Sequence, residues 1–361
     1  MNIGRVFITG LILFNLISPP AAAQATGSAS YDAVLAANVA YVNSLQLSDG
    51  AITDNRKYIE PYFANQAAIA LTLIPEQIPR VRSWMRWYIG HRNARDVWGL
   101  TGTVYVYDVA DDATAASRNN ADSTDAYAAT FLSVAFNAWQ RGDTVTRSFV
   151  RDLIPELNQI AAVEAQTLQP NGLTWAKPSY RVEYLEDNCQ VYRGLADYAT
   201  LLAAVGDKNG SARYAREAQT VLDAIQSVLW VPSQNEYAFF INEKGKLVFA
   251  TAKTAWYAGV AELFPIIYGV ISPSSDRAKS LYDRFNAEFP NWDTLDKPDA
   301  FPQADVAYAA ALMNDSSRAT RYVQSVTTKY QDRGFPWPWH VGESAWLIPT
   351  AKRLNGDSDV L

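Results

Sequence analysis

The sequence predicts an all-α protein with the (α/α)6 toroid fold, a ring of about six helical hairpins with two small β-hairpin inserts. Three observations lead to this prediction. Helix-length segments follow one another along the 361 residues, they alternate between two hydrophobic patterns, and no linker or low-complexity tract divides them. We therefore expect one toroid domain, over residues 26–361, although this length exceeds the commonest domain size.

One half of the helices should be amphipathic, with one face in water. Residues 147–163 place Phe149, Leu153 and Leu157 on one face, with the 3.6-residue period of such a helix. The same pattern occurs in further segments, at residues 31–45, 78–90, 211–229, 276–287 and 316–330.

The other half is apolar on nearly every face, and a helix without a polar face must be enclosed by other helices. Residues 191–205 belong to this group, and Gly206 is expected to end that helix. A ring of outer and inner helices explains the alternation better than a globin-like bundle or a helical solenoid, for which no 34-residue repeat is present. The other segments of this kind are residues 62–71, 127–136, 255–264, 306–313 and 344–351.

Two inserts interrupt the helical rhythm. Residues 101–108 alternate with period two, which is typical of a strand. Residues 237–249 resemble a hairpin that turns at Lys244 and Gly245. Both inserts come just before inner helices, so we expect them on one rim of the ring.

The first 25 residues have the three-part layout of a secretory signal peptide. Arg5 supplies positive charge, residues 6–17 are almost wholly apolar, and a small-residue cleavage site follows Pro20. The apolar run is shorter than the roughly 20 residues that span a bilayer, which disfavours an uncleaved membrane anchor and any stable membrane insertion. Secretion or export to the periplasm is therefore predicted.

Composition excludes several classes of partner and cofactor. The formal net charge is −6 and no run of Lys or Arg is present, which argues against nucleic acid and anionic membranes as partners. Cys189 is the only cysteine, so neither an intramolecular disulfide nor a cysteine metal site is possible. The two histidines, His91 and His340, form no metal motif, and no phosphate-binding loop is present. We expect no cofactor.

Acids and aromatic residues gather just before or at the start of the predicted inner helices. In a ring of parallel inner helices these N-terminal ends converge on one face, so the side chains should surround a central cleft. The alternative is that the acids cap helices and the aromatics pack in the core. The candidate catalytic residues are Asp122, Asp125, Glu186 and Asp187. The candidate substrate-binding residues are Glu60, Tyr62, Trp175, Tyr180, Tyr184, Trp256, Trp337, His340 and Glu343.

Paired carboxylates in an aromatic cleft suit the hydrolysis of a glycosidic bond. One acid must stay protonated to assist the leaving oxygen, while the second ionises and activates water or attacks the anomeric carbon. Aromatic faces suit the stacking of sugars. A carbohydrate chain is therefore the expected partner, and glycoside hydrolysis the expected reaction.

The alternating helices and the openings of the inner helices resemble the six-hairpin glycosidase superfamily. At the third inner helix, Leu185-Glu186-Asp187 is similar to the acid-bearing segment of glucoamylases, with Leu185 where a tryptophan is usual. This resemblance implies that Glu186 is the general acid and that Glu343, at the sixth inner helix, lies where the base is found. Other members of the superfamily use an Asp at the second inner helix, which Asp122 or Asp125 would match.

Two other functions are compatible with the sequence. Helical toroids also carry polysaccharide lyases; here Tyr184 or His340 would be the base and Asn188 would help to neutralise a uronate. A toroid that binds carbohydrate without catalysis is the other alternative.

Overall fold

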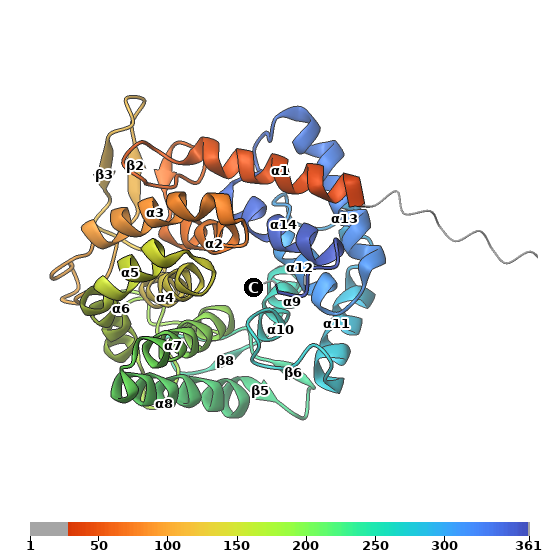
Figure 1. Cartoon of the computed structure of the whole chain (residues 1–361). Helices are drawn as coiled ribbons and strands as arrows, with labels where there is room; N and C mark the ends of the chain where they lie inside the picture. Colours follow the sequence, from red (N-terminus) through yellow and green to blue (C-terminus); the bar gives the residue numbers. More distant parts are fainter. Residues whose placement is uncertain (1–27, 360–361) are drawn as a thin grey trace, which may run out of the picture.

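The computed structural model describes residues 28–359, so the predicted signal peptide, residues 1–25, lies outside the described part of the chain. The helices form a closed ring of hairpins, seen end-on in Figure 1. The predicted (α/α)6 toroid is therefore confirmed.

The inner layer of the ring consists of the helices predicted to be apolar on every face. Each contacts the next, and α14 contacts both α12 and α2, which closes the circle. Neighbouring helices approach closely: a Cβ atom at Gly194 on α7 would lie 2.2 Å from the carbonyl oxygen of Ala129 on α4, so only glycine fits there. In chain order the inner helices are α2 (Pro61–Leu71), α4 (Thr124–Arg141), α7 (Leu185–Val205), α9 (Ala255–Ala261) with α10 (Phe264–Ile267), α12 (Ala304–Leu312) and α14 (Val341–Leu354).

The outer layer consists of the amphipathic helices. The first of them, α1, packs along the last inner helix, α14, so the two ends of the ring meet (Figure 1). The outer helices are α1 (Ser28–Leu45), α3 (Ile78–Gly90), α5 (Thr144–Asp152), α6 (Ile154–Thr167), α8 (Lys208–Ala224), α11 (Asp276–Glu288) and α13 (Ser316–Lys329).

The two layers begin their helices differently. Four outer helices start with a side-chain cap, in which Asp143, Asp207, Ser275 or Asp315 accepts the backbone N–H of the third residue after it. The first residues of α2, α4, α7, α9 and α12 receive no cap from the residue that precedes the helix. The acids that open these five helices therefore do not act as N-cap residues of their own helices.

Two predicted boundaries are corrected by the structure. The single helix predicted at residues 147–163 is two helices, because Pro155 in the first turn of α6 has no N–H to continue α5. Helix α8 ends earlier than predicted and passes into a π-helical turn at Ile225–Leu229. Gly206 ends α7 with a φ of 94°, as predicted.

The strands are short and decorate the ring. The predicted hairpin at 237–249 is confirmed by strands β7 and β8, which turn through Lys244 and Gly245. The strand predicted at 101–108 is wrong in extent: pairing begins only at Tyr107, and residues 102–106 are all buried, so their alternation does not reflect a two-sided sheet. The antiparallel sheets are β1 (Tyr58–Ile59), β2 (Tyr107–Val109), β3 (Ala115–Ser117); β4 (Glu183–Tyr184), β7 (Phe240–Ile241), β8 (Leu247–Val248); and β5 (Trp230–Val231), β6 (Glu236–Tyr237).

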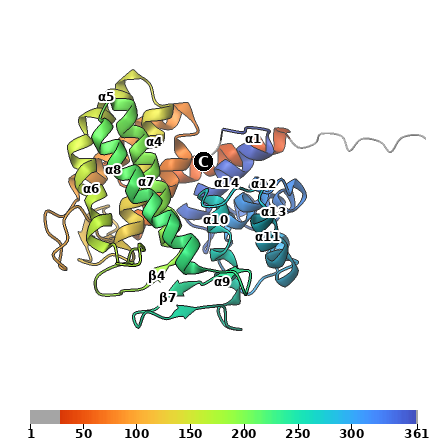
Figure 2. The ribbon, with the colours of Figure 1, turned by 90° about the horizontal axis from the view of Figure 1, so that it is seen from below.

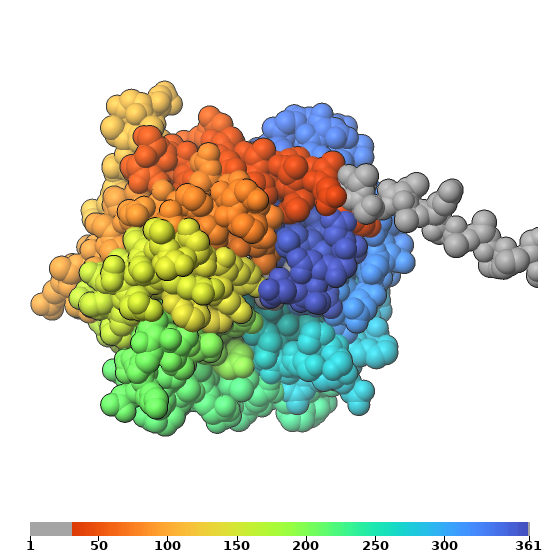
Figure 3. Space-filling model, viewed as in Figure 1, coloured from red at the N-terminus to blue at the C-terminus, as the bar shows by residue number. Residues whose placement is uncertain are grey.

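The two faces of the ring differ. Strands β4 and β7 lie at one end of the molecule, beside α9 (Figure 2). The opposite face, in front in Figure 3, carries the C-terminal segment close to the ring centre and has only a narrow hollow there. Arg141 at the end of α4 pairs with Asp359 at 3.2 Å, which fixes that segment. Within residues 28–359, no helix has the length and apolar character needed to cross a membrane.

Candidate active site

A cavity of about 600 Å³ lies where the inner helices begin. All six inner segments, or the loops that lead into them, contribute to its wall. We call it the central cavity. Within the described chain its wall contains eleven aromatic residues and one histidine, His340, but neither Lys nor Arg. Its seven carboxylates are Asp54, Glu60, Asp122, Glu186, Asp187, Asp305 and Glu343.

The structure brings most of the sequence-predicted site residues into this cavity. The residues that line it are Glu60, Tyr62, Asp122, Tyr180, Tyr184, Glu186, Asp187, Trp337, His340 and Glu343.

Three predicted site residues do not line the cavity. Asp125 is fully buried behind it, where Ser123 and Thr174 donate hydrogen bonds of 2.6 Å to its carboxylate. Trp175 lies under the guanidinium of Arg181 at 4.6 Å, and Trp256 packs in the core against Phe285 and Phe289. These positions offer no contact with a substrate in the cavity, so the predicted roles of Asp125, Trp175 and Trp256 are not supported by the geometry.

Glu186, in the first turn of α7, is half-buried in the cavity wall. Tyr62 on α2 donates a 2.6 Å hydrogen bond to Oε1 of Glu186, and Gln190 one turn further along α7 donates to the oxygen of Tyr62, also at 2.6 Å. Burial raises the pKa of Glu186, the hydrogen bond from Tyr62 opposes this rise, and the charge of Asp122 adds to it. The surroundings therefore favour a protonated carboxyl group that is held in one orientation.

Asp187 shares a hydroxyl group with Asp125. The single Ser123 hydroxyl lies 2.9 Å from Oδ2 of Asp187 and 2.6 Å from Oδ1 of Asp125. Because that hydroxyl has one proton, it cannot donate to both carboxylates at once. Burial and the nearby charges of Asp125 and Glu186 raise the pKa of Asp187, and burial raises the pKa of Asp125 to about 6. The pair is thus suited to hold a proton between its members.

Glu60 and Asp122 lie at the beginnings of α2 and α4. Oε1 of Glu60 is buried without a hydrogen-bond partner among the described residues. Burial raises the pKa of Glu60 to about 8, and the charges of Asp122 and Asp54 contribute to this rise. Asp122 is exposed to the cavity, and no described side chain forms an ion pair with it.

Glu343, in the first turn of α14, is surrounded by donors. Its Oε1 and Oε2 accept the backbone N–H groups of Gln303 and Ala304 at 3.1 and 2.8 Å, so it caps α12 from the neighbouring helix. Nε2 of His340 lies 3.5 Å from Oε1, and Nδ1 of His340 lies 2.9 Å from Asp54. Burial lowers the pKa of His340, but the hydrogen bonds to Asp54 and Glu343 outweigh it and raise the pKa to about 9.

The sequence argument missed two acids of the cavity. Asp305 lies in the first turn of α12; burial and the charges of Glu343 and Glu186 raise its pKa to about 8. Its place in the helix matches those of Asp125 and Glu186, so the same signal could have identified it. Asp54 lies in the loop between α1 and α2, and only the fold brings it to His340, which is 286 positions away in sequence.

The chain offers no metal centre in its described part: residues 28–359 contain no group of three or more His, Cys, Asp or Glu side chains that could hold an ion. Cys189 is buried, and burial raises the pKa of its thiol well above the usual value, which disfavours a nucleophilic thiolate.

Comparison with known proteins gives a fold but no close relative. No protein-family model matches the sequence, and no curated protein sequence is significantly similar to it. Among solved structures, a rhamnosidase from Klebsiella oxytoca with rhamnose bound is similar with a TM-score of 0.60 and 13% identity, over 90% of this chain and 64% of the rhamnosidase. The chain thus spans less than two thirds of that enzyme.

Two other similar structures are covered almost completely. A GH63 mannosylglycerate hydrolase from Thermus thermophilus, in complex with glucose, has a TM-score of 0.60 and 12% identity over 88% of this chain and 99% of that one. An alpha-amylase from Clostridium perfringens has a TM-score of 0.62 and 9% identity over 89% and 97%. At such identities the likeness establishes the fold alone, which is an (α/α)6 toroid.

Proposed function

We propose that this protein is a glycoside hydrolase that cleaves glycosidic bonds in a poly- or oligosaccharide with a pair of carboxyl groups. The observation that carries the proposal is the central cavity, where seven carboxylates and eleven aromatic residues meet without a single Lys or Arg in the described wall. Buried carboxylates without a Lys or Arg partner lower the stability of the folded protein. Glycoside hydrolysis uses such acids, and the aromatic rings suit the faces of sugars.

The general acid in this proposal is Glu186. Tyr62 donates to its Oε1, so Oε2 is left to carry the acid proton toward the glycosidic oxygen. Burial raises the pKa of Glu186, which favours the protonated form that a general acid needs before the bond breaks.

The base in this proposal is Glu343. It belongs to the sixth inner segment and Glu186 to the third, so the two acids lie on opposite sides of the ring. The groups around the Glu343 carboxylate described above are all donors. Its Oε1 faces both Gln303 and His340, whereas Oε2 faces only the Ala304 N–H among the described residues and keeps a further lone pair that accepts a proton from water. Asp122, which faces the cavity without an ion-pair partner among the described residues, is the next candidate for the base.

The geometry argues against the lyase alternative. The hydrogen bonds to Asp54 and Glu343 outweigh burial and raise the pKa of His340 to about 9, and burial and the contact with Tyr180 raise the pKa of Tyr184, so neither side chain is a ready base. The amide of Asn188 is buried and bonded to Thr174 and Tyr184, away from the cavity.

The test of the function is product analysis. Purified protein is incubated with a panel of neutral and acidic oligosaccharides, and the products are examined for reducing ends and for ultraviolet absorption. We expect new reducing ends without unsaturated products, and none from the Glu186→Gln variant. Products that absorb in the ultraviolet would identify a lyase, and binding without cleavage would identify a non-catalytic toroid.

Export is a separate part of the proposal and rests on residues 1–25 alone. The layout of that segment predicts cleavage after Ala23 or Ala25. N-terminal sequencing of the exported protein should therefore begin within a few residues of Gln24, whereas an intact Met1 would contradict it.

A further inference from the structure

A second hollow of about 670 Å³ adjoins the central cavity on the rim, between the end of α1 with the loop that follows it and the segment that precedes α14. We call it the rim groove. It shares two wall residues, Tyr58 and Trp337, with the central cavity, so the two spaces lie side by side at these side chains. The remaining wall residues of the rim groove are Tyr41, Ser44, Leu45, Asn55, Arg56, Lys57, Gly334, Phe335 and Trp339.

The two spaces have opposite charge. The central cavity contains seven carboxylates and no Lys or Arg, whereas the rim groove contains Arg56 and Lys57 and no Asp or Glu among its described wall residues. Both of these cations are exposed, and neither forms an ion pair with a carboxylate of the described chain. Two adjacent unpaired cations in a protein of net charge −6 indicate an anionic ligand.

The groove also offers aromatic surfaces. Trp337 is 58% exposed at the junction and is held edge-on against Phe301, 5.4 Å away. Tyr41 and Phe335 pack together in the wall, with ring centroids 4.6 Å apart. An exposed tryptophan between two hollows is suited to stack on a sugar that passes from one to the other.

The backbone around the groove is held in an unfavourable conformation. Arg56 and Phe335 have φ values of 67° and 59°, in the left-handed region that residues with a side chain seldom adopt. Thr53 and Asn55 accept the N–H groups of Arg56 and Lys57, which keeps the two cations side by side on the rim. Such conformations persist where the surrounding structure imposes them, commonly at binding sites.

We propose that the rim groove binds a sugar unit bearing a carboxylate, on the same chain as a neutral sugar that enters the central cavity. This inference rests on the proposed function, since it names the class of substrate for that site. Arg56 and Lys57 would contact the carboxylate, and Trp337 would stack on the sugar at the junction. The described wall of the central cavity has no Lys or Arg to bind a second uronate there, so the substrate is a mixed chain of acidic and neutral sugars.

The test compares matched oligosaccharides in binding and in hydrolysis. Glucuronate-containing oligosaccharides from gellan, xanthan and gum arabic are used in native form and after carboxyl reduction, which makes the uronates neutral. Affinities are measured by calorimetry at low and high salt with the wild type and with the Arg56→Gln/Lys57→Gln, Trp337→Ala and Lys244→Gln variants. Lys244, on the exposed β7–β8 turn outside both hollows, is the matched control.

We expect at least one native oligosaccharide to bind roughly 5- to 10-fold more tightly than its reduced form, as two exposed charge contacts allow. The Arg56→Gln/Lys57→Gln variant and high salt should both remove this preference. Trp337→Ala should weaken the binding of native and reduced forms alike, and Lys244→Gln should change the affinity for neither form. If no native form is preferred, or if the preference survives Arg56→Gln/Lys57→Gln, the inference is overturned.

Hydrolysis of the same oligosaccharides separates this inference from the proposed function. If native forms bind through Arg56 and Lys57 but none is cleaved, the carboxylate site in the rim groove is supported and the proposed hydrolase activity is contradicted. If reduced and native forms are cleaved with equal KM, the proposed hydrolase activity is supported and the carboxylate site in the rim groove is contradicted.

Discussion

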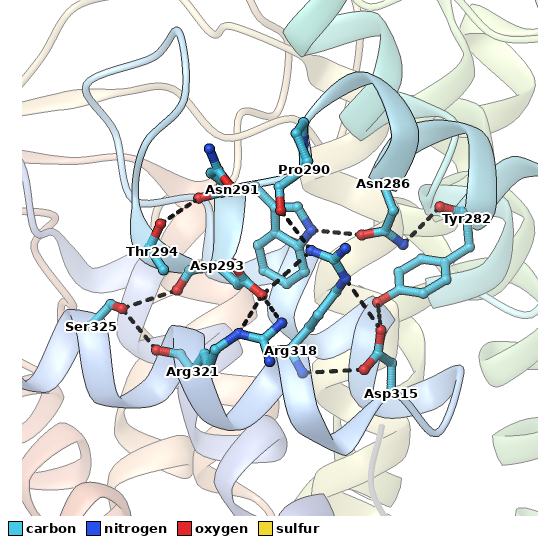
Figure 4. Close-up of polar contacts among 11 residues, drawn as sticks. Tyr282, Asn286, Pro290, Asn291, Asp293, Thr294, Asp315, Arg318, Arg321 and Ser325 are labelled. Atoms are coloured by element: carbon cyan, nitrogen blue, oxygen red, sulfur yellow. Dashed lines mark hydrogen bonds and ion pairs between the residues drawn. The ribbon is translucent and has the colours of Figure 1, made fainter.

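Two sets of buried carboxylates in this molecule have different surroundings. Asp293, in the turn that leads from α11 to α12, is 2% exposed and is held by Arg321 at 2.6 and 3.0 Å and by Arg318 at 3.4 Å (Figure 4). Both arginines come from outer helix α13. Around Asp293 the negative charge is matched by two cations, so its burial stabilises the outer layer.

The acids of the central cavity lack such partners. Glu60, Glu186, Asp187 and Asp305 have no Lys or Arg beside them in the described cavity wall, and burial raises the pKa of each. An unpaired buried acid lowers stability whenever it must ionise. The comparison indicates that Asp293 stabilises the fold, whereas the acids of the central cavity lower its stability, as is usual for acids in active sites.

The largest expected effect is on activity, from Glu186→Gln. Removal of a general acid should lower kcat by about 10²-fold or more, since proton transfer contributes that much to such reactions. The melting temperature should not fall, because the amide keeps the shape of the side chain and needs no ionisation. The matched control is Glu288→Gln, at the exposed end of α11, which should retain full activity. Near-full activity of Glu186→Gln would mean that another carboxyl group is the general acid.

The next largest effect is on stability, from Asp293→Asn. Loss of the charge leaves Arg318 and Arg321 without their buried partner, and we expect a loss of about 2–3 kcal/mol in the free energy of unfolding, below the full value of a buried pair because the arginines are partly exposed. Specific activity of the folded protein should stay unchanged. Asp283→Asn, in an exposed pair with Lys279, is the control and should change stability by less than about 0.5 kcal/mol. Equal losses in the two variants would mean that burial of Asp293 contributes nothing.

The smallest effect has the opposite sign and depends on pH. The pKa of Glu60 is raised to about 8 in the folded state, so the folded protein binds an extra proton between about pH 4.3 and 8 and loses stability as pH rises through that window. Glu60→Gln cannot ionise and should be about 1–3 kcal/mol more stable than wild type at pH 8, with little difference at pH 4.

Denaturant unfolding at both pH values measures this difference, with Glu76→Gln on the surface as the control. A Glu60→Gln advantage that is the same at pH 4 and pH 8 would show that ionisation of Glu60 is not its cause.

The fold could be predicted because the hydrophobic pattern of each helix determines whether it lies in the inner or the outer layer of the ring. Residues 127–136 and 306–313 are apolar all round, and α4 and α12 are the buried helices of the ring. The break at Pro155 was missed because apolar periodicity continues across it. The strand at 101–108 was overextended because its alternating residues are buried on both sides.

The candidate site was predictable in its location and less so in its members. Converging N-terminal ends placed Glu60, Asp122 and Glu186 in one cavity. Sequence could not distinguish a side chain that faces the cavity from one that faces the core, so Asp125 and Trp256 were included. It also could not find Asp54, whose contact with His340 joins residues 286 positions apart.

The most direct test of this account is the titration of Glu186 itself. Carboxyl carbon resonances of glutamates are followed by NMR from pH 3 to 9 in protein labelled with ¹³C-glutamate, for the wild type and Glu186→Gln. The resonance that disappears in the variant should titrate above the ordinary value of about 4.3. If the lost resonance titrates at or below that value, Glu186 is ionised at neutral pH and the proposed general acid is contradicted.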